Sequence, residues 1–296
     1  MKNKLFLSVD MDEIYLCRWA TGSKKSIWKT PDIFFRKVYN SSKPRGDIVK
    51  DTDKILKLFD SVNFKSTFFF TGLIASFYPD LVKKISDLGH EIASHNYYHI
   101  DYEYVSKKKM YRDLKRSKDL LESITGKKVI GYRSPNSSIN KDTVKILEEL
   151  DFKYDSSVTP TRRLMGKFGK FLDAPLHPYN PSFDNIGKEG NSNIFEFPWA
   201  VFPLMNLPAG SGIMHRIAGN TYNEIATKFS LEKGTVAYYF HPYEISDLNF
   251  TFKKNWLISF FLRNLGSTYY NSLKNYLEKY KNRLVNGITL YEEIRK

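Results

Sequence analysis

Two aspartates separated by one residue, Asp10 and Asp12, follow the apolar run 5–9 near the start of the chain. Alternate side chains of an extended strand point to the same side, so both carboxylates can enter one pocket. Two like charges placed together raise the pKa of one of them unless a cation lies between. Taken alone, the two aspartates are better explained as a strand-end cap or as part of an ion pair.

Two of the six histidines, His95 and His99, stand four residues apart. On a helical turn this spacing places both imidazoles on one face, where they can reach one metal ion. An aspartate added to them completes a facial triad that leaves positions open for water. One carboxylate would then ligate the metal, and the other would accept a proton from water whose pKa the metal lowers to about 7.

Two further candidates follow expected strands. Arg133 opens the sequence Arg-Ser-Pro-Asn. A buried arginine must be paired, and we expect it to clamp Asp10, the alternative being a surface arginine beside a proline turn. His241 lies in the sequence Phe-His-Pro-Tyr-Glu, where it is a candidate proton donor to a leaving amine or, equally, a packed core histidine.

Short apolar runs that alternate with helical periods must position these residues. We expect strands at 5–9, 66–70, 91–93, 129–132, 153–155, 194–197 and 235–240. We expect helices from 47, at 79–89, 106–124, 141–150, 222–229 and 267–284, with irregular chain through most of 160–219. Repeated βα units imply a parallel sheet with helical cover, either a barrel or an open sheet, whose strand ends carry the site.

Composition limits the partners and the location. The single cysteine, Cys17, excludes an intramolecular disulfide framework and a cysteine-built metal site. The 46 basic and 32 acidic residues give a net charge of +14, which either attracts a phosphate-bearing partner or reflects a lysine-rich composition. The chain shows no secretory leader, which predicts a cytoplasmic location, peripheral to the inner face of the membrane if it contacts lipid at all.

Two segments carry open alternatives. The apolar run 256–262 is too short to cross a membrane and is better explained as a buried helix than as a helix lying on the membrane surface. The long segment 13–45 is expected to form a lid or a subunit interface, which leaves a homo-oligomer open.

Four segments taken in order resemble the NodB-like polysaccharide deacetylases of carbohydrate esterase family 4. They are 9–12, 89–99, 132–135 and 240–244, with further agreement at 66–72 and 152–158. The resemblance implies an α/β fold, a distorted (β/α) barrel. It also implies a single domain over 1–296, with a core of about 5–244 and a helical extension of about 245–296.

The resemblance also assigns roles. It implies a divalent metal, usually zinc, held by Asp12, His95 and His99. It further implies Asp10 as catalytic base oriented by Arg133, His241 as general acid, and a backbone N–H near Asn136 as oxyanion donor. Tyr97, Tyr98 and Trp199 are candidate sugar-stacking faces, and a core role for Trp199 is equally open.

The chain departs from the family pattern at two places. Met11 separates the two aspartates, which many members have adjacent, and this spacing resembles the subgroup that contains intracellular-type deacetylases and cyclic-amide hydrolases. The segment 195–199 is the best match to the motif that usually supplies an aspartate and a tryptophan. Glu196 as partner of Arg133, and Glu244 as the residue that orients His241, therefore stay open.

The function we expect is metal-dependent removal of an N-acetyl group from an N-acetylated sugar in a polysaccharide, a lipid-linked glycan or a sugar intermediate. The lack of a leader and the charge of +14 favour a phosphate- or lipid-linked intermediate of surface-polysaccharide assembly. Hydrolysis of a cyclic amide or formamide on the same metal site is the alternative. A non-catalytic carbohydrate- or membrane-binding protein has no need to retain all six residues, and nucleic-acid binding is not expected.

Overall fold

A parallel sheet centred on the first strand organises the chain. The structure is a computed structural model that describes residues 2–14, 47–162, 171–247 and 256–296. Most of the segment 13–45 predicted as a lid or interface, with Cys17, lies outside these residues. The strands are β1 (Leu5–Met11), β2 (Thr67–Phe70), β3 (Glu91–Ser94), β4 (Gly131–Tyr132), β5 (Tyr154–Asp155), β6 (Phe195–Glu196), β9 (Val236–Phe240) and β10 (Leu284–Val285).

These strands run side by side and parallel. β1 pairs with β2 on one side and β9 on the other, and the order continues from β2 through β3, β4 and β5 to β6. The segment after β6 returns to β9. The Ala237 N–H donates to the Pro198 carbonyl at 2.7 Å, and the Ala237 carbonyl accepts from the Ala200 N–H at 3.1 Å. The strands therefore curl into a ring, and the distorted (β/α) barrel predicted from the sequence is confirmed.

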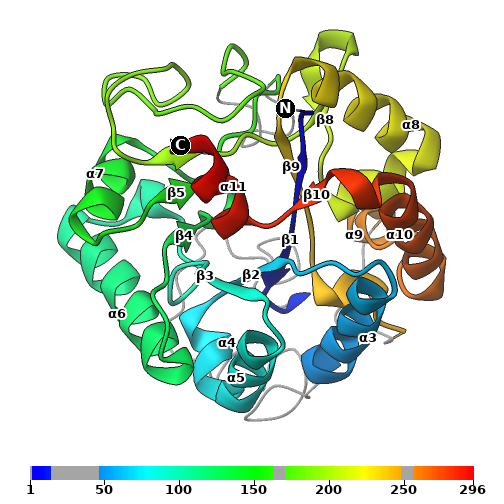
Figure 1. Cartoon of the computed structure of the whole chain (residues 1–296), viewed down its shortest axis with the longest axis horizontal. Coiled ribbons are helices and arrows are strands. Elements are labelled where there is room, and N and C mark those ends of the chain that lie inside the picture. The colour runs from blue at the N-terminus through cyan, green and yellow to red at the C-terminus, as the bar shows by residue number, and fades with distance from the viewer. Residues whose placement is uncertain (1, 15–46, 163–170, 248–255) are drawn as a thin grey trace.

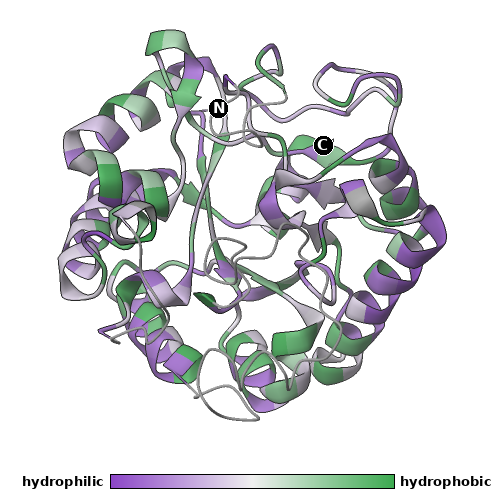
Figure 2. Ribbon diagram, turned by 180° about the vertical axis from the view of Figure 1, so that it is seen from behind, coloured by the Kyte–Doolittle hydropathy of each residue, from purple (hydrophilic) through white to green (hydrophobic). Residues whose placement is uncertain are grey.

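Helices surround this ring (Figure 1). They are α3 (Asp47–Ser61), α4 (Gly72–Phe77), α5 (Pro79–Asp87), α6 (Lys107–Thr125), α7 (Lys141–Glu149), α8 (Gly212–Lys233), α9 (Trp256–Phe261) and α10 (Ser267–Tyr280). A further helix, α11 (Gly287–Ile294), lies inside this circle of helices in Figure 1. Figure 2 shows hydrophobic and hydrophilic stripes on the same helices. In α3 the buried stripe contains Ile48, Ile55 and Leu58, the apolar positions that recur at helical spacing in the sequence.

The last strand and helix pack at the amino-terminal end of the ring. β10 pairs with the start of β1, Leu5 opposite Leu284, on the side where β2 has not yet begun. At the start of α11 the Ile288 N–H donates to Glu91 Oε2 at 2.9 Å, and a Cβ on Gly287 would stand 2.1 Å from the Tyr154 hydroxyl oxygen. Glycine at 287 therefore lets α11 approach the strands closely.

Two predicted helices have different bounds in the structure. The helix predicted at 222–229 begins at Gly212, where Ser211 caps it, and continues past a left-handed Gly219; the density of glycine and proline in the sequence hid its first turns. The helix predicted at 267–284 ends at Tyr280, so the segment expected to be a helical extension also supplies β10.

The apolar run 256–262 does form a helix, α9, but the prediction that it is buried is wrong, since Trp256 is 80% exposed. Among the described residues, no helix combines the length and the apolar character that a membrane span requires. Two short strands, β7 (Val201–Phe202) and β8 (Leu207–Pro208), form a separate antiparallel pair.

Candidate active site

The predicted chemical residues gather where the parallel strands end. Asp10 is the last residue but one of strand β1, and Asp12 directly follows the strand. His95 follows β3, Arg133 follows β4 and His241 follows β9. In a barrel of parallel strands all these ends share one rim, which is where (β/α) barrels place their sites. All five side chains are buried.

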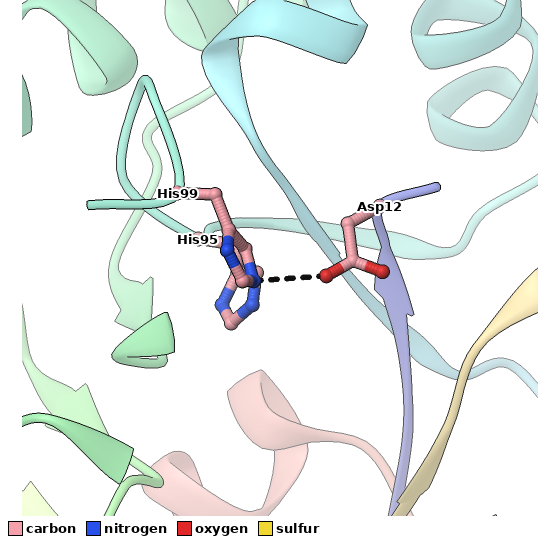
Figure 3. Close-up of side chains that lie close together, drawn as sticks. All are labelled: Asp12, His95 and His99. Atoms are coloured by element: carbon pink, nitrogen blue, oxygen red, sulfur yellow. Dashed lines mark ion pairs between the residues drawn. The ribbon is translucent and has the colours of Figure 1, made fainter. Parts of the chain in front are cut away.

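Asp12, His95 and His99 form a compact cluster (Figure 3). Each offers one ligand atom, and these atoms lie within 4.8 Å of one another. His99 Nε2 is 3.0 Å from Asp12 Oδ2, and His95 Nδ1 is 2.8 Å from the carbonyl oxygen of Arg133. When Nδ1 donates to that carbonyl, the His95 Nε2 lone pair is left for a ligand. Burial, helped by His99, lowers the pKa of His95 well below its usual range, so the ring is the neutral form that binds metals.

The helical turn predicted for the two histidines is wrong, although the imidazoles do meet. Residues 95–100 form an irregular loop with left-handed backbone at Asn96 (φ 52°) and His99 (φ 54°). The carbonyl oxygen of Asn96 accepts from the Gly72 N–H, and the Asn96 side chain donates to the Ile100 carbonyl at 3.1 Å. These bonds replace helical ones, and each left-handed residue costs on the order of 1–3 kcal/mol that the surroundings must offset.

The cluster fits a divalent metal. Asp12 Oδ1 and His99 Nδ1 are buried and have no hydrogen-bond partner among the described residues. An unsatisfied buried polar group costs about 1–3 kcal/mol, so a cation at this position would remove a standing penalty. One carboxylate and two imidazoles are a three-ligand set of the kind that holds catalytic zinc and leaves a fourth position open.

Asp10 is held by Arg133. Arg133 Nη1 donates to Asp10 Oδ1 and to Ser8 Oγ, both at 2.7 Å. Arg133 Nε and Nη2 donate to the carbonyl and hydroxyl oxygens of Ser156, each at 2.9 Å. The contact expected from the sequence is present, and the guanidinium fixes the direction of the Asp10 carboxylate; the catalytic role of Asp10 stays a prediction.

His241 is held by Glu244. Glu244 Oε1 is 2.9 Å from His241 Nδ1 and accepts from the His241 backbone N–H at 3.1 Å, while Glu244 Oε2 accepts from Arg216 Nε at 2.7 Å. His241 Nε2 points to the metal cluster, 3.8 Å from Asp12 Oδ1. Burial alone would lower the pKa of His241, but the carboxylates of Asp12 and Glu244 outweigh it and raise that pKa to about 9.

Glu196 has a different environment from the one considered in the sequence. Its Oε1 accepts from the backbone N–H groups of Ser157 (3.1 Å) and Val158 (2.9 Å), and no hydrogen bond joins it to Arg133 in the described part of the chain. The neighbouring acid is Asp155, its partner across the β5–β6 pairing. Of the two glutamates left open, Glu244 is therefore the one that contacts a predicted catalytic residue.

The remaining predicted residues lie around the cluster. The buried ring of Tyr97 packs on Tyr98 (4.6 Å between centroids) and under the Arg116 guanidinium (3.8 Å). Trp199 is also buried, with Nε1 donating to the Ser156 carbonyl at 3.0 Å. Asn136 is half-buried with left-handed backbone (φ 55°) just after β4. Sugar stacking by Tyr97 and Trp199, and an oxyanion contact at Asn136, stay predictions.

Three residues of this site were missed from the sequence. Ser8 stands two residues before Asp10, and strand alternation places it on the same side, so that signal was present. Ser156 carries no local signal for its two bonds to Arg133. Arg216 lies in the part of α8 that the sequence predicted to be irregular, and no local signal marks it as a partner of Glu244.

Replacing Glu244 by glutamine is expected to destabilise the fold and reduce activity together. Burial alone would raise the pKa of Glu244, but Arg216 and His241 outweigh it and hold that pKa below its usual range. The neutral amide would leave the buried Arg216 without a counter-ion, which costs about 3–5 kcal/mol.

Urea unfolding at two pH values checks this. A carboxylate with a depressed folded pKa contributes stability above its unfolded pKa near 4.5, and that contribution is lost as the pH falls through the folded value. The difference in the free energy of unfolding between the parent and Glu244→Gln should therefore be largest at pH 7 and should shrink below pH 4. The control is Glu293→Gln, which breaks the partly exposed pair with Lys4 and should cost no more than about 1 kcal/mol. Equal losses in the two variants would contradict the assignment.

Comparison with known proteins gives a consistent family likeness. Residues 38–154 match the family model described as polysaccharide deacetylase. A peptidoglycan deacetylase-like protein of Gibberella zeae is 36% identical over 108 residues, which are 36% of this chain and 32% of that protein. The alignment thus spans about a third of the length of this curated relative.

Solved structures extend the likeness to the whole fold. A Mycobacterium smegmatis protein assigned to the polysaccharide deacetylases covers 100% of this chain and 91% of its own, with a TM-score of 0.65 at 18% identity. The allantoinase Puue covers 97% of this chain and 88% of its own, with a TM-score of 0.64 at 16% identity. At these identities the two structures establish the fold that this chain shares with them.

Proposed function

We propose that the protein, whose residues 38–154 match the polysaccharide deacetylase family model, hydrolyses the acetamido group of an N-acetylated sugar with the help of a divalent metal, zinc in our proposal. The products would be acetate and a free amine on the sugar. The Gibberella zeae relative is named a peptidoglycan deacetylase-like protein, which agrees with an N-acetylated glycan as the substrate class.

One observation carries the proposal. The buried trio Asp12, His95 and His99 lies on the same rim as an arginine-held carboxylate and a glutamate-held histidine. Amide hydrolysis needs an activated water, a base and a proton donor to the leaving nitrogen, and this rim holds a candidate for each. A module that only binds carbohydrate has no need for this combination.

The chain's own residues divide the chemistry. Asp12, His95 and His99 would hold the metal, which when bound supplies a Lewis acid for the amide carbonyl and for water. Asp10, oriented by Arg133, accepts the proton of the attacking water. His241 donates a proton from Nε2 to the departing nitrogen while Glu244 holds its Nδ1. A proton donor must carry its proton at the working pH, and the Glu244 carboxylate beside Nδ1 favours the protonated form of His241.

The proposal also concerns the group to which the N-acetylated sugar is attached. The net charge of +14 favours a substrate that carries phosphate, free or as part of a lipid-linked glycan. Such a substrate would suit surface-polysaccharide assembly at the cytoplasmic face of a membrane. That location and a homo-oligomeric state stay predictions from the sequence.

A substrate panel tests the function. Purified protein loaded with zinc should release acetate and a free amine from N-acetylglucosamine oligomers or from a diphosphate-linked N-acetylated sugar, while Asp10→Asn loaded with zinc should not. Formamides and allantoin serve as further arms, since the same fold is found in an allantoinase. Ring opening or formate release without acetate release would replace the deacetylase proposal with cyclic-amide or formamide hydrolysis.

A further inference from the structure

A pair of buried acids, Asp155 and Glu196, lies beside the site and takes no part in the chemistry described above. The two residues face each other across the parallel β5–β6 pairing and are fully buried within the ring. Two adjacent carboxylates in such surroundings would repel strongly unless a proton or a cation separated them.

Each carboxyl has one oxygen fixed by the loop that follows β5. Glu196 Oε1 accepts the backbone N–H groups of Ser157 and Val158, and Asp155 Oδ1 accepts the Ser157 hydroxyl at 2.5 Å. The second oxygens, Glu196 Oε2 and Asp155 Oδ2, find no other donor in the described residues. A hydrogen bond between these two second oxygens would satisfy both of them, and such a bond requires a proton on one of the two carboxyl groups.

The loop that this pair holds also holds Arg133. The Ser157 hydroxyl accepts from the backbone N–H of Ser134, next to Arg133, at 2.7 Å. Ser156 accepts from Arg133 Nε and Nη2 through its carbonyl and hydroxyl oxygens. Arg133 in turn donates to Asp10. These hydrogen bonds, together with the backbone of residues 133–134 and 156–158, therefore link the acid pair to the predicted base.

The charges around the pair favour one proton rather than none. The charge of Arg133 favours the ionised form of Asp155, but Arg133 is already paired with Asp10. Burial raises the pKa of Asp155 to about 6, and burial together with the Asp155 charge raises that of Glu196 well above its usual range. Burial and the same carboxyl charges raise the pKa values of Tyr132 and Tyr179, so both neighbours are neutral.

We propose that Asp155 and Glu196 share a single proton, carried by Glu196, and act as positioning residues that fix the 156–158 loop and through it the Arg133–Asp10 pair. The catalytic part of this inference rests on the proposed deacetylase function. Without the shared proton, two carboxylates would compete with Asp10 for the one guanidinium.

Two substitutions at Glu196 test the proposal. Glu196→Gln keeps the acceptor for both loop N–H groups and replaces the carboxylic O–H by an amide N–H that donates to Asp155. It should keep kcat for acetate release within about threefold of the parent, whereas Glu196→Ala should lower kcat by about 100-fold, the cost of a misplaced catalytic group. The control is Glu91→Ala, which removes a half-buried glutamate that also holds a backbone N–H, at the opposite end of the ring; kcat of this variant should stay near that of the parent.

The protonation state of Glu196 can be measured directly, and a role in packing alone would not affect it. The infrared difference spectrum between the parent and Glu196→Gln at pH 7 should contain the C=O stretch of a protonated carboxylic acid. Because the folded pKa of Glu196 lies above the unfolded value near 4.5, its contribution to stability falls as the pH rises from 4.5. As the pH rises above 4.5, the unfolding equilibrium constant of the parent should therefore increase relative to that of Glu196→Gln, by up to about tenfold per pH unit.

Three results would overturn the inference: no carboxylic-acid band in the difference spectrum, a pH-independent stability difference, or a loss in Glu196→Gln as large as in Glu196→Ala. If the parent protein releases no acetate at all, the proposed function fails by itself. The infrared and stability measurements still decide whether the proton is shared.

Discussion

Asp10→Asn is expected to keep the metal and to lose about 10²–10⁴-fold in turnover, the range that a positioned general base contributes. Asparagine has the size of aspartate, and its side-chain oxygen can still accept from Arg133 Nη1. It cannot take a proton from water at neutral pH. The variant therefore separates the chemistry of Asp10 from the architecture that Asp10 shares with Ser8 and Ser156.

Two measurements on the same sample check this. Metal content by elemental analysis should equal that of the parent, and acetate release at saturating substrate should fall with little change in KM. Asp247→Asn, at an exposed acid, is the matched substitution and should leave both values unchanged. Turnover close to that of the parent in Asp10→Asn would remove Asp10 as the base.

Asp12→Ala is expected to abolish metal binding at micromolar metal, and activity with it. Asp12 is the only carboxylate in the cluster with His95 and His99, and two neutral imidazoles offer no negative charge to a divalent cation. The expected loss of affinity exceeds the 10–100-fold that is typical for residues that only support a ligand.

Zinc titration against a chromogenic chelator measures the affinity without any assay of turnover. His95→Ala should weaken binding in the same way, while Asp10→Asn should bind zinc like the parent. Tight stoichiometric binding in Asp12→Ala would show that the ion lies elsewhere, and the assignment of the cluster would then fail.

Much of this site was predictable because strand geometry is regular. Alternation along β1 places Asp10 and Asp12 on one side, and parallel strands bring His95, Arg133 and His241 to one rim. The predicted positions of strands β1, β2, β3 and β9 agree with the structure to within about two residues. These elements are short, apolar and bounded by polar turns, which is the pattern that single sequences display most clearly.

The rest depends on backbone conformations and long-range contacts that no local pattern encodes. The histidine loop needs left-handed Asn96 and His99, and spacing alone suggested a helix there instead. The sequence left open whether Glu244 orients His241, because only Arg216, 28 residues earlier, allows this carboxylate to be buried. β10 is two residues long, and only its partner Leu5 identifies it as a strand.

The pairing of β10 with β1 has a consequence for biosynthesis. Translation delivers Leu5 and Phe6 long before their partners Leu284 and Val285, which lie more than 270 residues later in the chain. Until β10 has been synthesised, the backbone groups of Leu5 and Phe6 that pair with it have no partner strand. A nascent chain in this state offers an apolar strand edge to chaperones or to other nascent chains, so the yield of folded protein should depend on how quickly the final segment is released.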